Sequence, residues 1–516
     1  MAIWKWRVAG SALSALLLGG VVTASAGAAS SGSVETTPPS VGATLTDELD
    51  DFVAEQQTRT GSPGVAYALV GPEGVQHAGY RGVDGNGDPV TERTAFLWGS
   101  VSKPVTATLM LQLAATGTLD LDASVIRYLP EFRLADKATS DTITLRQLVD
   151  QSSGIPGLLN LTDRAGDRRP GEVLPELRDV ALEHRPGAAH TYSSVNYMVL
   201  AAAVERVTGR SFAEVLTQRL LGPAGMSGAI TTGTAAAQRL PAGNRYLFGV
   251  PRSFETPYDS AGLSSGYLGG TLGDLAAFAR INLTGGPLLS DRQRAALHTA
   301  AASTGPDQGY AMGWRTWPVF GSKAPMVWHG GAVPGFQSSI IVLPERNQAI
   351  VVLQNVYGSF QENELLDTGW GLASIVSGAD PVSHRDGPLY PALLAVLGLV
   401  VVALLAAIVV SLLRQRRSRA AGGESRSGRV RIGVLACWLL GLGVLGYGLL
   451  SLPAQFGVGL TQVALWAPDV AVLLWAALGS TAITMLVRIA VASRGARGPR
   501  RDERQIGRGP VLDQVE

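Results

Sequence analysis

The sequence predicts an α+β fold, an antiparallel sheet flanked by helices with a helical subdomain, followed by three transmembrane helices. Two observations predict the α+β part. Strand-like segments occur early and again late in the first 380 residues, whereas helical periodicity dominates between them. This order differs from the regular alternation of strand and helix that a parallel sheet requires. A third observation, a set of apolar runs in the last quarter of the chain, predicts the membrane helices.

The composition excludes several classes of function. The chain has 516 residues and a formal net charge of +1, which gives no reason to expect a nucleic-acid partner. Its single cysteine, Cys437, lies within an apolar run, so neither an intramolecular disulfide nor a thiolate metal cluster can form. The sequence therefore implies no metal and no cofactor.

The N-terminus has the pattern of a secretory signal peptide over residues 1–26. A basic start precedes an apolar stretch at 8–22, and small residues at 24–26 form a cleavage site. An uncleaved membrane anchor is the alternative, and either one exports the domain that follows. Residues 27–44 are rich in Ser, Ala, Gly, Thr and Pro and are predicted to be a linker.

The folded domain is expected over residues 45–380. Apolar residues at helical spacing from Leu45 to Val53 predict an opening helix, and a turn at 71–74 between two apolar segments predicts a hairpin. The remaining patterns predict helices at 104–115, 145–149 and 197–207, strands at 326–329, 338–343 and 348–354, and a closing helix at 361–377.

Three apolar segments are long enough to be transmembrane helices, at residues 391–413, 432–452 and 470–487. The loop at 414–431 and the tail at 494–516 are rich in arginine, whereas residues 451–468 contain no Lys or Arg. The positive-inside rule places this loop and this tail in the cytoplasm and the folded domain outside it. The prediction is a multi-pass protein of the cell membrane, with the lipid bilayer as a partner.

Ser100-Val101-Ser102-Lys103 is a Ser-x-x-Lys motif. On a helix this spacing puts both side chains on one face, and burial there would allow the lysine to lose its proton and activate the serine. Only four of the 42 basic residues are lysines, and arginine could not take this role. Apolar residues on both sides of the motif predict that it is mostly buried. A solvated surface lysine is the alternative.

Further segments extend this pattern. Several segments resemble, in the same order, blocks of the class C β-lactamase-like serine hydrolases, which belong to the β-lactamase and penicillin-binding-protein superfamily. These segments are residues 96–103, 119–123, 144–154 and Arg185-Pro186-Gly187. The resemblance implies a β-lactamase/DD-peptidase-like fold over about residues 45–378. It also implies an enzyme that forms an acyl-enzyme with a β-lactam, a D-amino-acid peptide or an ester.

The resemblance implies a catalytic role for three residues. Ser100 would be the nucleophile, Lys103 its base, and Tyr192 would share the proton transfer and protonate the leaving group. Where the family has Tyr-x-Asn, this chain has Ser194, whose shorter side chain lacks the amide that contacts lysine and substrate. Asn196 lies two residues further on. The replacement predicts weaker recognition of amide substrates.

His329-Gly330-Gly331 resembles the late strand motif of the family. Glycines there would let the strand approach the substrate, and the resemblance implies that Gly331 and Ala332 lie at an oxyanion hole, where the Ala332 amide joins that of Ser100. His329 would hydrogen-bond the substrate. A structural histidine beside Trp328 is the alternative.

The sequence thus predicts a membrane-anchored serine hydrolase with an extracytoplasmic catalytic domain, acting on a small molecule or a peptide. A catalytically inert penicillin-binding-like sensor is the alternative. A transporter is disfavoured, because the charged residues Asp469 and Arg488 lie only near the ends of the spans. The pattern Gly-x-Ser-x-Gly around Ser264 lacks the strand that a nucleophile elbow needs. The oligomeric state is not predicted.

Overall fold

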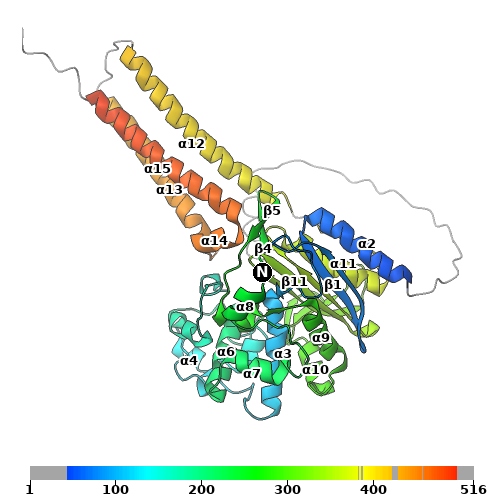
Figure 1. The fold of residues 1–516 in the computed structure, drawn as a ribbon. Coiled ribbons are helices and arrows are strands. Elements are labelled where there is room, and N and C mark those ends of the chain that lie inside the picture. The colour runs from blue at the N-terminus through cyan, green and yellow to red at the C-terminus, as the bar shows by residue number, and fades with distance from the viewer. Residues whose placement is uncertain (1–42, 382, 385–386, 421–427, 456, 497–516) are drawn as a thin grey trace, which may run out of the picture. The chain divides into compact units, whose positions relative to one another are not determined.

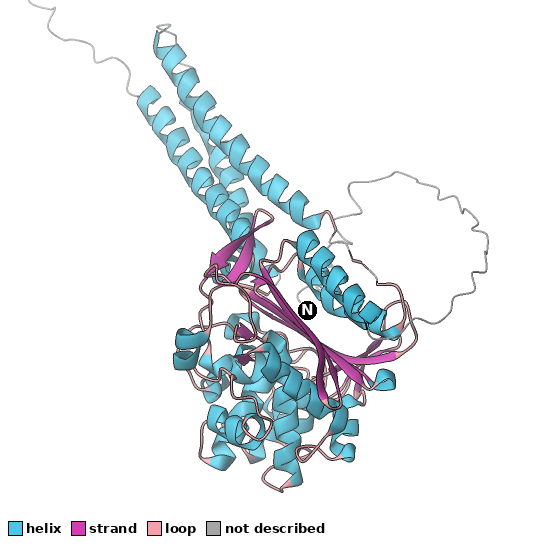
Figure 2. Cartoon of the chain, turned by 45° about the vertical axis from the view of Figure 1, so that its right-hand side comes forward, coloured by secondary structure: helices cyan, strands magenta, loops and turns pink. Residues whose placement is uncertain are grey.

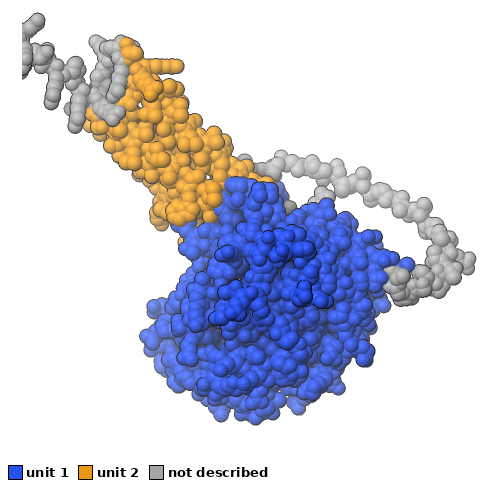
Figure 3. Space-filling view, in the orientation of Figure 1, with its two compact units in different colours: residues 1–388, 456–469 blue, residues 389–455, 470–516 orange. Residues whose placement is uncertain are grey.

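The computed structural model describes residues 43–381, 383–384, 387–420, 428–455 and 457–496. The predicted signal peptide, nearly all of the linker and most of the C-terminal tail lie outside the described residues. The chain divides into two compact units (Figure 3). One unit comprises Met1–Pro388 and Phe456–Asp469, and the other comprises Leu389–Gln455 and Val470–Glu516.

The first unit is built on an eight-stranded antiparallel sheet with the order β2-β1-β12-β11-β10-β9-β8-β7 (Figure 2). The predicted hairpin pairs β1 (Gly64–Gly71) with β2 (Gly74–Gly82). On its other side β1 pairs with β12, so the early and late parts of the chain meet within the sheet. The remaining strands are β7 (Ala302–Gly305), β8 (Gln308–Tyr310), β9 (Arg315–Pro318), β10 (Pro325–Val333), β11 (Phe336–Leu343) and β12 (Gln348–Gln354).

Helices cover both faces of this sheet. On one face α2 (Ala43–Thr60) packs with α11 (Glu362–Ser377), and on the other α3 (Ser102–Ala115), α6 (Ser194–Thr208) and α9 (Leu272–Thr284) belong to the larger core. Strand β1 is buried on both sides, with alternate residues in the two cores. This alternation follows from the period of two along a strand. The predicted α+β fold with a helical subdomain is confirmed.

Shorter elements complete the domain. The α-helices are α4 (Lys137–Ser140), α5 (Leu145–Val149), α7 (Phe212–Leu216), α8 (Gly233–Arg239) and α10 (Asp291–His298). Two small sheets contain β13 (Val356–Tyr357), β4 (Gly243–Leu247) and β5 (Val250–Phe254), and β3 (Phe96–Leu97) with β6 (Gly269–Gly270).

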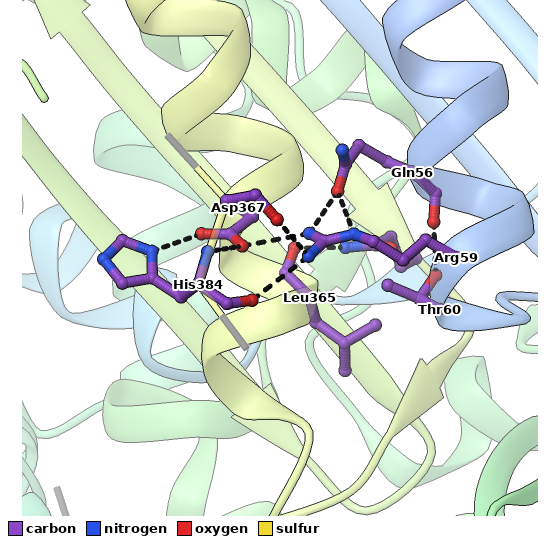
Figure 4. A network of polar contacts seen from close by, with 8 residues as sticks. Gln56, Arg59, Thr60, Leu365, Asp367 and His384 are labelled. Carbon is purple, nitrogen blue, oxygen red and sulfur yellow. Dashed lines mark hydrogen bonds and ion pairs between the residues drawn. The ribbon is translucent and has the colours of Figure 1, made fainter. Parts of the chain in front are cut away.

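A buried ionic network joins the two helices of the outer layer (Figure 4). Arg59 of α2 contacts the carboxylate of Asp367 on α11 at 2.9 Å, and this carboxylate is fully buried. His384, which follows α11, donates its backbone N–H to Asp367 and contacts it through Nδ1, both at 2.6 Å. The chain that leaves the domain is therefore tied to the helix that begins it.

The second unit contains three long helices, α12 (Leu389–Ala420), α13 (Gly428–Gln455) and α15 (Pro468–Ala496). Within them, stretches of 29, 24 and 26 residues are long and apolar enough to cross a membrane. The helices extend beyond the predicted spans, because hydropathy marks only the apolar part of a helix. Thus α12 continues through residues 414–420 of the predicted loop.

Candidate active site

Ser100 and Lys103 lie together at the start of α3. Ser100 is in a 3₁₀ turn (Gly99–Val101) that leads directly into α3, and Lys103 is the second residue of this helix. The Lys103 amine lies 3.0 Å from Ser100 Oγ, 3.1 Å from Ser194 Oγ and 2.6 Å from the carbonyl oxygen of Ser265. A neutral amine can donate to the last two and accept the hydroxyl proton of Ser100.

The surroundings of Lys103 favour its neutral form. Its side chain is fully buried, and this desolvation lowers the pKa of Lys103 to about 7, against an opposing effect of the Asp163 charge. Arg315 adds a smaller lowering. A substantial fraction of the lysine is therefore unprotonated near neutral pH, as a general base requires.

Tyr192 lies beside the Lys103 amine. Its ring centroid is 4.8 Å from that amine. Burial raises the pKa of Tyr192 to about 12, although the nearby Ser100 hydroxyl and the Arg315 charge oppose this shift. The phenol thus keeps its proton at neutral pH and is suited to donate it to a leaving group.

Ser194, the first residue of α6, retains one of the contacts that the missing asparagine would make. Its hydroxyl accepts a hydrogen bond from Lys103, but it carries no amide for a substrate. Asn196 does not substitute for it. The Asn196 side chain is buried and bonds to Ser153 and Gln151 within the helical subdomain.

Two glycines let strand β10 approach the turn that carries Ser100. A Cβ atom on Gly331 would lie 1.9 Å from the Trp98 carbonyl oxygen, and one on Gly99 would lie 2.3 Å from the Ala332 nitrogen. Gly99 also has a positive φ of 50°, which favours glycine. This close approach brings the Ala332 amide beside the serine turn, as an oxyanion hole with two amide donors would need.

His329 lies behind these groups. Its side chain is 1% exposed, its Nδ1 donates to the Gly330 carbonyl at 2.7 Å, and Nε2 lies 3.4 Å from the Tyr310 hydroxyl. Burial lowers the pKa of His329 well below its usual value, so the ring is neutral. A direct contact between His329 and a substrate would require one of these two hydrogen bonds to open.

The structure adds residues that the motifs did not indicate. The Ser265 carbonyl binds Lys103, and Asp163 and Arg315 act on its charge. These residues reach the site through tertiary packing, so no local pattern links them to Ser100. The Gly-x-Ser-x-Gly pattern around Ser264, which was rejected as a nucleophile elbow, lies next to Ser265 in this neighbourhood. Ser264 itself is buried and donates to the Tyr197 carbonyl at 2.9 Å.

The fold and this site define serine hydrolases of the β-lactamase and penicillin-binding type. The β-lactamase family model matches residues 49–373, more than half of the chain. The chain therefore belongs to the β-lactamase family.

Comparisons with curated relatives agree with this assignment, and a solved structure agrees with the fold. Penicillin-binding protein 4 of Amycolatopsis lactamdurans is 31% identical over 312 residues, which cover 57% of this chain and 81% of that protein. Protein flp of Staphylococcus aureus strain MW2 is 26% identical over 55% of this chain and 57% of its own length. The octameric penicillin-binding protein homologue of Pyrococcus abyssi superposes with a TM-score of 0.59 and 22% identity, covering 66% of this chain and 79% of that chain.

Proposed function

We propose that this chain is a membrane-anchored serine hydrolase that forms and then hydrolyses an acyl-enzyme on Ser100. One observation carries the proposal. The buried Lys103 amine, with a pKa of about 7, lies 3.0 Å from Ser100 Oγ. A hydroxyl so placed can lose its proton to the lysine as it attacks a carbonyl carbon.

The geometry supports a complete sequence of proton transfers. Neutral Lys103 accepts the Ser100 proton as Oγ bonds to the substrate carbon, and the amides of Ser100 and Ala332 stabilise the developing oxyanion. The phenol of Tyr192 donates a proton to the leaving group as its bond to carbon breaks, and the proton on Lys103 restores the phenol. Water then attacks the ester and returns Ser100 to its starting state.

The substrate class that we propose is an ester in preference to an amide. The resemblance to the family leaves three candidate substrate classes, which are a β-lactam, a D-amino-acid peptide and an ester. Ser194 supplies the contact to Lys103 but no amide to hold a substrate amide in place. The relative named as a penicillin-binding protein supports testing a β-lactam as an acylating ligand.

The anchoring part of the proposal rests on the three long apolar helices and on the distribution of arginine. With the arginine-rich segments in the cytoplasm, the hydrolase domain and residues 451–468 lie outside it. The site would then act on substrates of the extracytoplasmic space.

Labelling with a fluorescent fluorophosphonate, a serine-reactive probe, tests the chemistry. The purified full chain in detergent should be labelled, and Ser100→Ala should not. The same preparation is then assayed with a β-lactam, a D-alanyl dipeptide and an activated ester. If the folded chain is not labelled at Ser100 and turns over none of the three, the hydrolase proposal is wrong and the inert binding module takes its place.

A further inference from the structure

The turn between strands β4 and β5 presents apolar side chains to solvent. Its register pairs Leu247 with Val250, so Phe248 and Gly249 form a two-residue loop. Residues 247–250 are called the hairpin tip below. Phe248 is 52% exposed and Val250 is 47% exposed. Of the phenylalanines that the structure describes, Phe248 alone is exposed.

The backbone of the hairpin tip does not explain its sequence. Phe248 has a φ of 51° and Gly249 has a φ of 78°. A two-residue hairpin turn with positive φ at both positions favours Asn-Gly or Asp-Gly, and a bulky side chain at the first position is an outlier. Phenylalanine thus strains this backbone without being buried in the core. The ring is therefore expected to make a contact that the folded hydrolase unit does not supply.

The hairpin tip is bonded to a residue at which a candidate membrane span begins. The backbone N–H of Phe248 donates to the carboxylate of Asp469 at 2.9 Å. Asp469 is 2% exposed and is the second residue of α15, whose apolar stretch starts at Pro468. The helix dipole also favours a carboxylate in this first turn. The hairpin tip therefore lies beside the point at which α15 would enter a membrane.

The segment that precedes α15 holds the same hairpin at a second place. It contains the short helix α14 (Leu460–Trp466), which Figure 1 shows beside β4. The guanidinium of Arg245 on β4 donates to the carbonyl oxygens of residues 464 and 465, both at 2.9 Å. The indole of Trp466 packs edge-on against Tyr357, with ring centroids 5.3 Å apart. The position of the hairpin next to the start of α15 thus depends on several contacts.

We propose that the hairpin tip is a lipid-binding element, which inserts Phe248 and Val250 into the surface of the membrane that α15 crosses. Apolar and aromatic side chains at this depth leave water while the backbone stays near the headgroups. Arg252 is exposed and lies two residues after Val250, on the same face of β5, where it can bind anionic headgroups. The inference rests on the membrane anchoring in the proposed function, and it adds a direct contact between the hydrolase unit and the bilayer.

The experiment measures quenching of a fluorophore on the hairpin tip of the full chain in phospholipid nanodiscs. Cys437 is the single cysteine, so Cys437→Ala allows nitrobenzoxadiazole to be attached at Phe248→Cys alone. A phospholipid with a nitroxide near the top of its acyl chain should remove most of this fluorescence. Val75→Cys is the matched control, because Val75 is also 52% exposed and lies in the hairpin of β1 and β2. A label there should keep nearly all of its fluorescence.

Two further variants test which side chains hold the tip in the membrane. With the label at Val250→Cys, Phe248→Asn should reduce quenching several-fold, and asparagine suits the positive φ, so the hairpin should still form. Arg252→Gln should reduce quenching in nanodiscs that contain anionic phosphatidylglycerol and leave it unchanged in neutral phosphatidylcholine. An unchanged signal in both lipids would contradict the headgroup contact. Circular dichroism checks that each variant is folded.

Three outcomes would overturn the proposal in different ways. If the label at residue 248 is quenched no more than that at residue 75, the tip does not contact lipid. If it is shielded from water but not quenched by the nitroxide, a protein surface covers the tip and the lipid is the wrong partner. Wild-type protein labelled at Cys437, within α13, is the positive control. If this label is not quenched either, the membrane-anchoring proposal falls together with the inference.

Discussion

At the scale of single residues, the ability of Lys103 to act as a base depends on its removal from water. Its amine contacts two hydroxyls and one carbonyl, and its side chain is fully buried. Burial alone would favour the neutral form strongly, but the charge of Asp163 restrains that shift. The balance leaves a pKa of about 7, where a base is most useful near neutral pH.

Replacing Lys103 by arginine tests whether this proton acceptor is required. Lys103→Arg keeps a positive charge and a good helix former, but guanidinium stays protonated at any physiological pH. We expect acylation by an activated ester to fall by at least ~10²-fold, with circular dichroism unchanged. Burst kinetics on wild type and variant measure the rate. A folded variant that acylates within a few-fold of wild type would show that Lys103 is not the base, and Tyr192 would become the leading candidate.

Ser194 tests the choice between esters and amides. Ser194→Asn restores a side-chain amide, so we expect the amide-to-ester ratio of kcat/KM to rise by up to about tenfold, the worth of one hydrogen bond. Ser194→Ala is the control, because it removes the contact with Lys103 without adding an amide. A ratio that stays the same or falls in folded Ser194→Asn would mean that this position does not select the substrate class.

The sequence could predict the residues that lie close along the chain. Ser100 and Lys103 are brought together by a single turn, so their spacing in the sequence was sufficient to predict that they lie close together. Asp163 and Arg315, which act on the charge of Lys103, could not be found this way. Both are distant from Ser100 in the sequence, so their position at the site depends on the packing of several elements.

At the scale of elements, periodicity predicted α2, α3, α6 and α11, but α9 was not predicted. The hairpin of β1 and β2 and the strands β10 to β12 were expected. Strands β1, β11 and β12 are buried along almost their whole length, and the turn at 71–74 marks the hairpin. The short strands β7 to β9 and the sheet of β13, β4 and β5 were missed. These strands have two to five residues, and β5 is largely exposed, so they carry little hydrophobic pattern.

The network between α2 and α11 gives a test of stability. Asp367→Ala leaves the Arg59 guanidinium without its buried partner, and we expect a loss of about 3 kcal/mol in the free energy of unfolding. Denaturant unfolding of the full chain in detergent, followed by tryptophan fluorescence, measures it. Asp141→Ala, which breaks the exposed pair with Lys137, should change stability by no more than about 0.5 kcal/mol. Equal losses in both variants would contradict a structural role for the buried network.

At the scale of the whole molecule, the arginine distribution predicts a topology that can be tested directly. Reporter fusions in the loop at 421–427 and after residue 496 are expected to behave as cytoplasmic, and a fusion after residue 380 as external. Alkaline phosphatase and green fluorescent protein fusions in a bacterial host give opposite signals for the two sides. An external signal from either arginine-rich site would overturn the model with three spans.

Helix α14 (Leu460–Trp466) is attached to β4 through its main-chain carbonyl oxygens, and this attachment predicts which positions vary in sequence among relatives. Arg245 recognises the carbonyl oxygens of Ala464 and Leu465, which every amino acid possesses. Substitutions at those two positions are therefore compatible with the same attachment, whereas Arg245 and Trp466 have specific partners. In homologues that share the three apolar helices, we expect Arg245 and Trp466 to be conserved or replaced together, whereas residues 460–465 vary. A relative without the C-terminal helices should have no selection to keep arginine at this position.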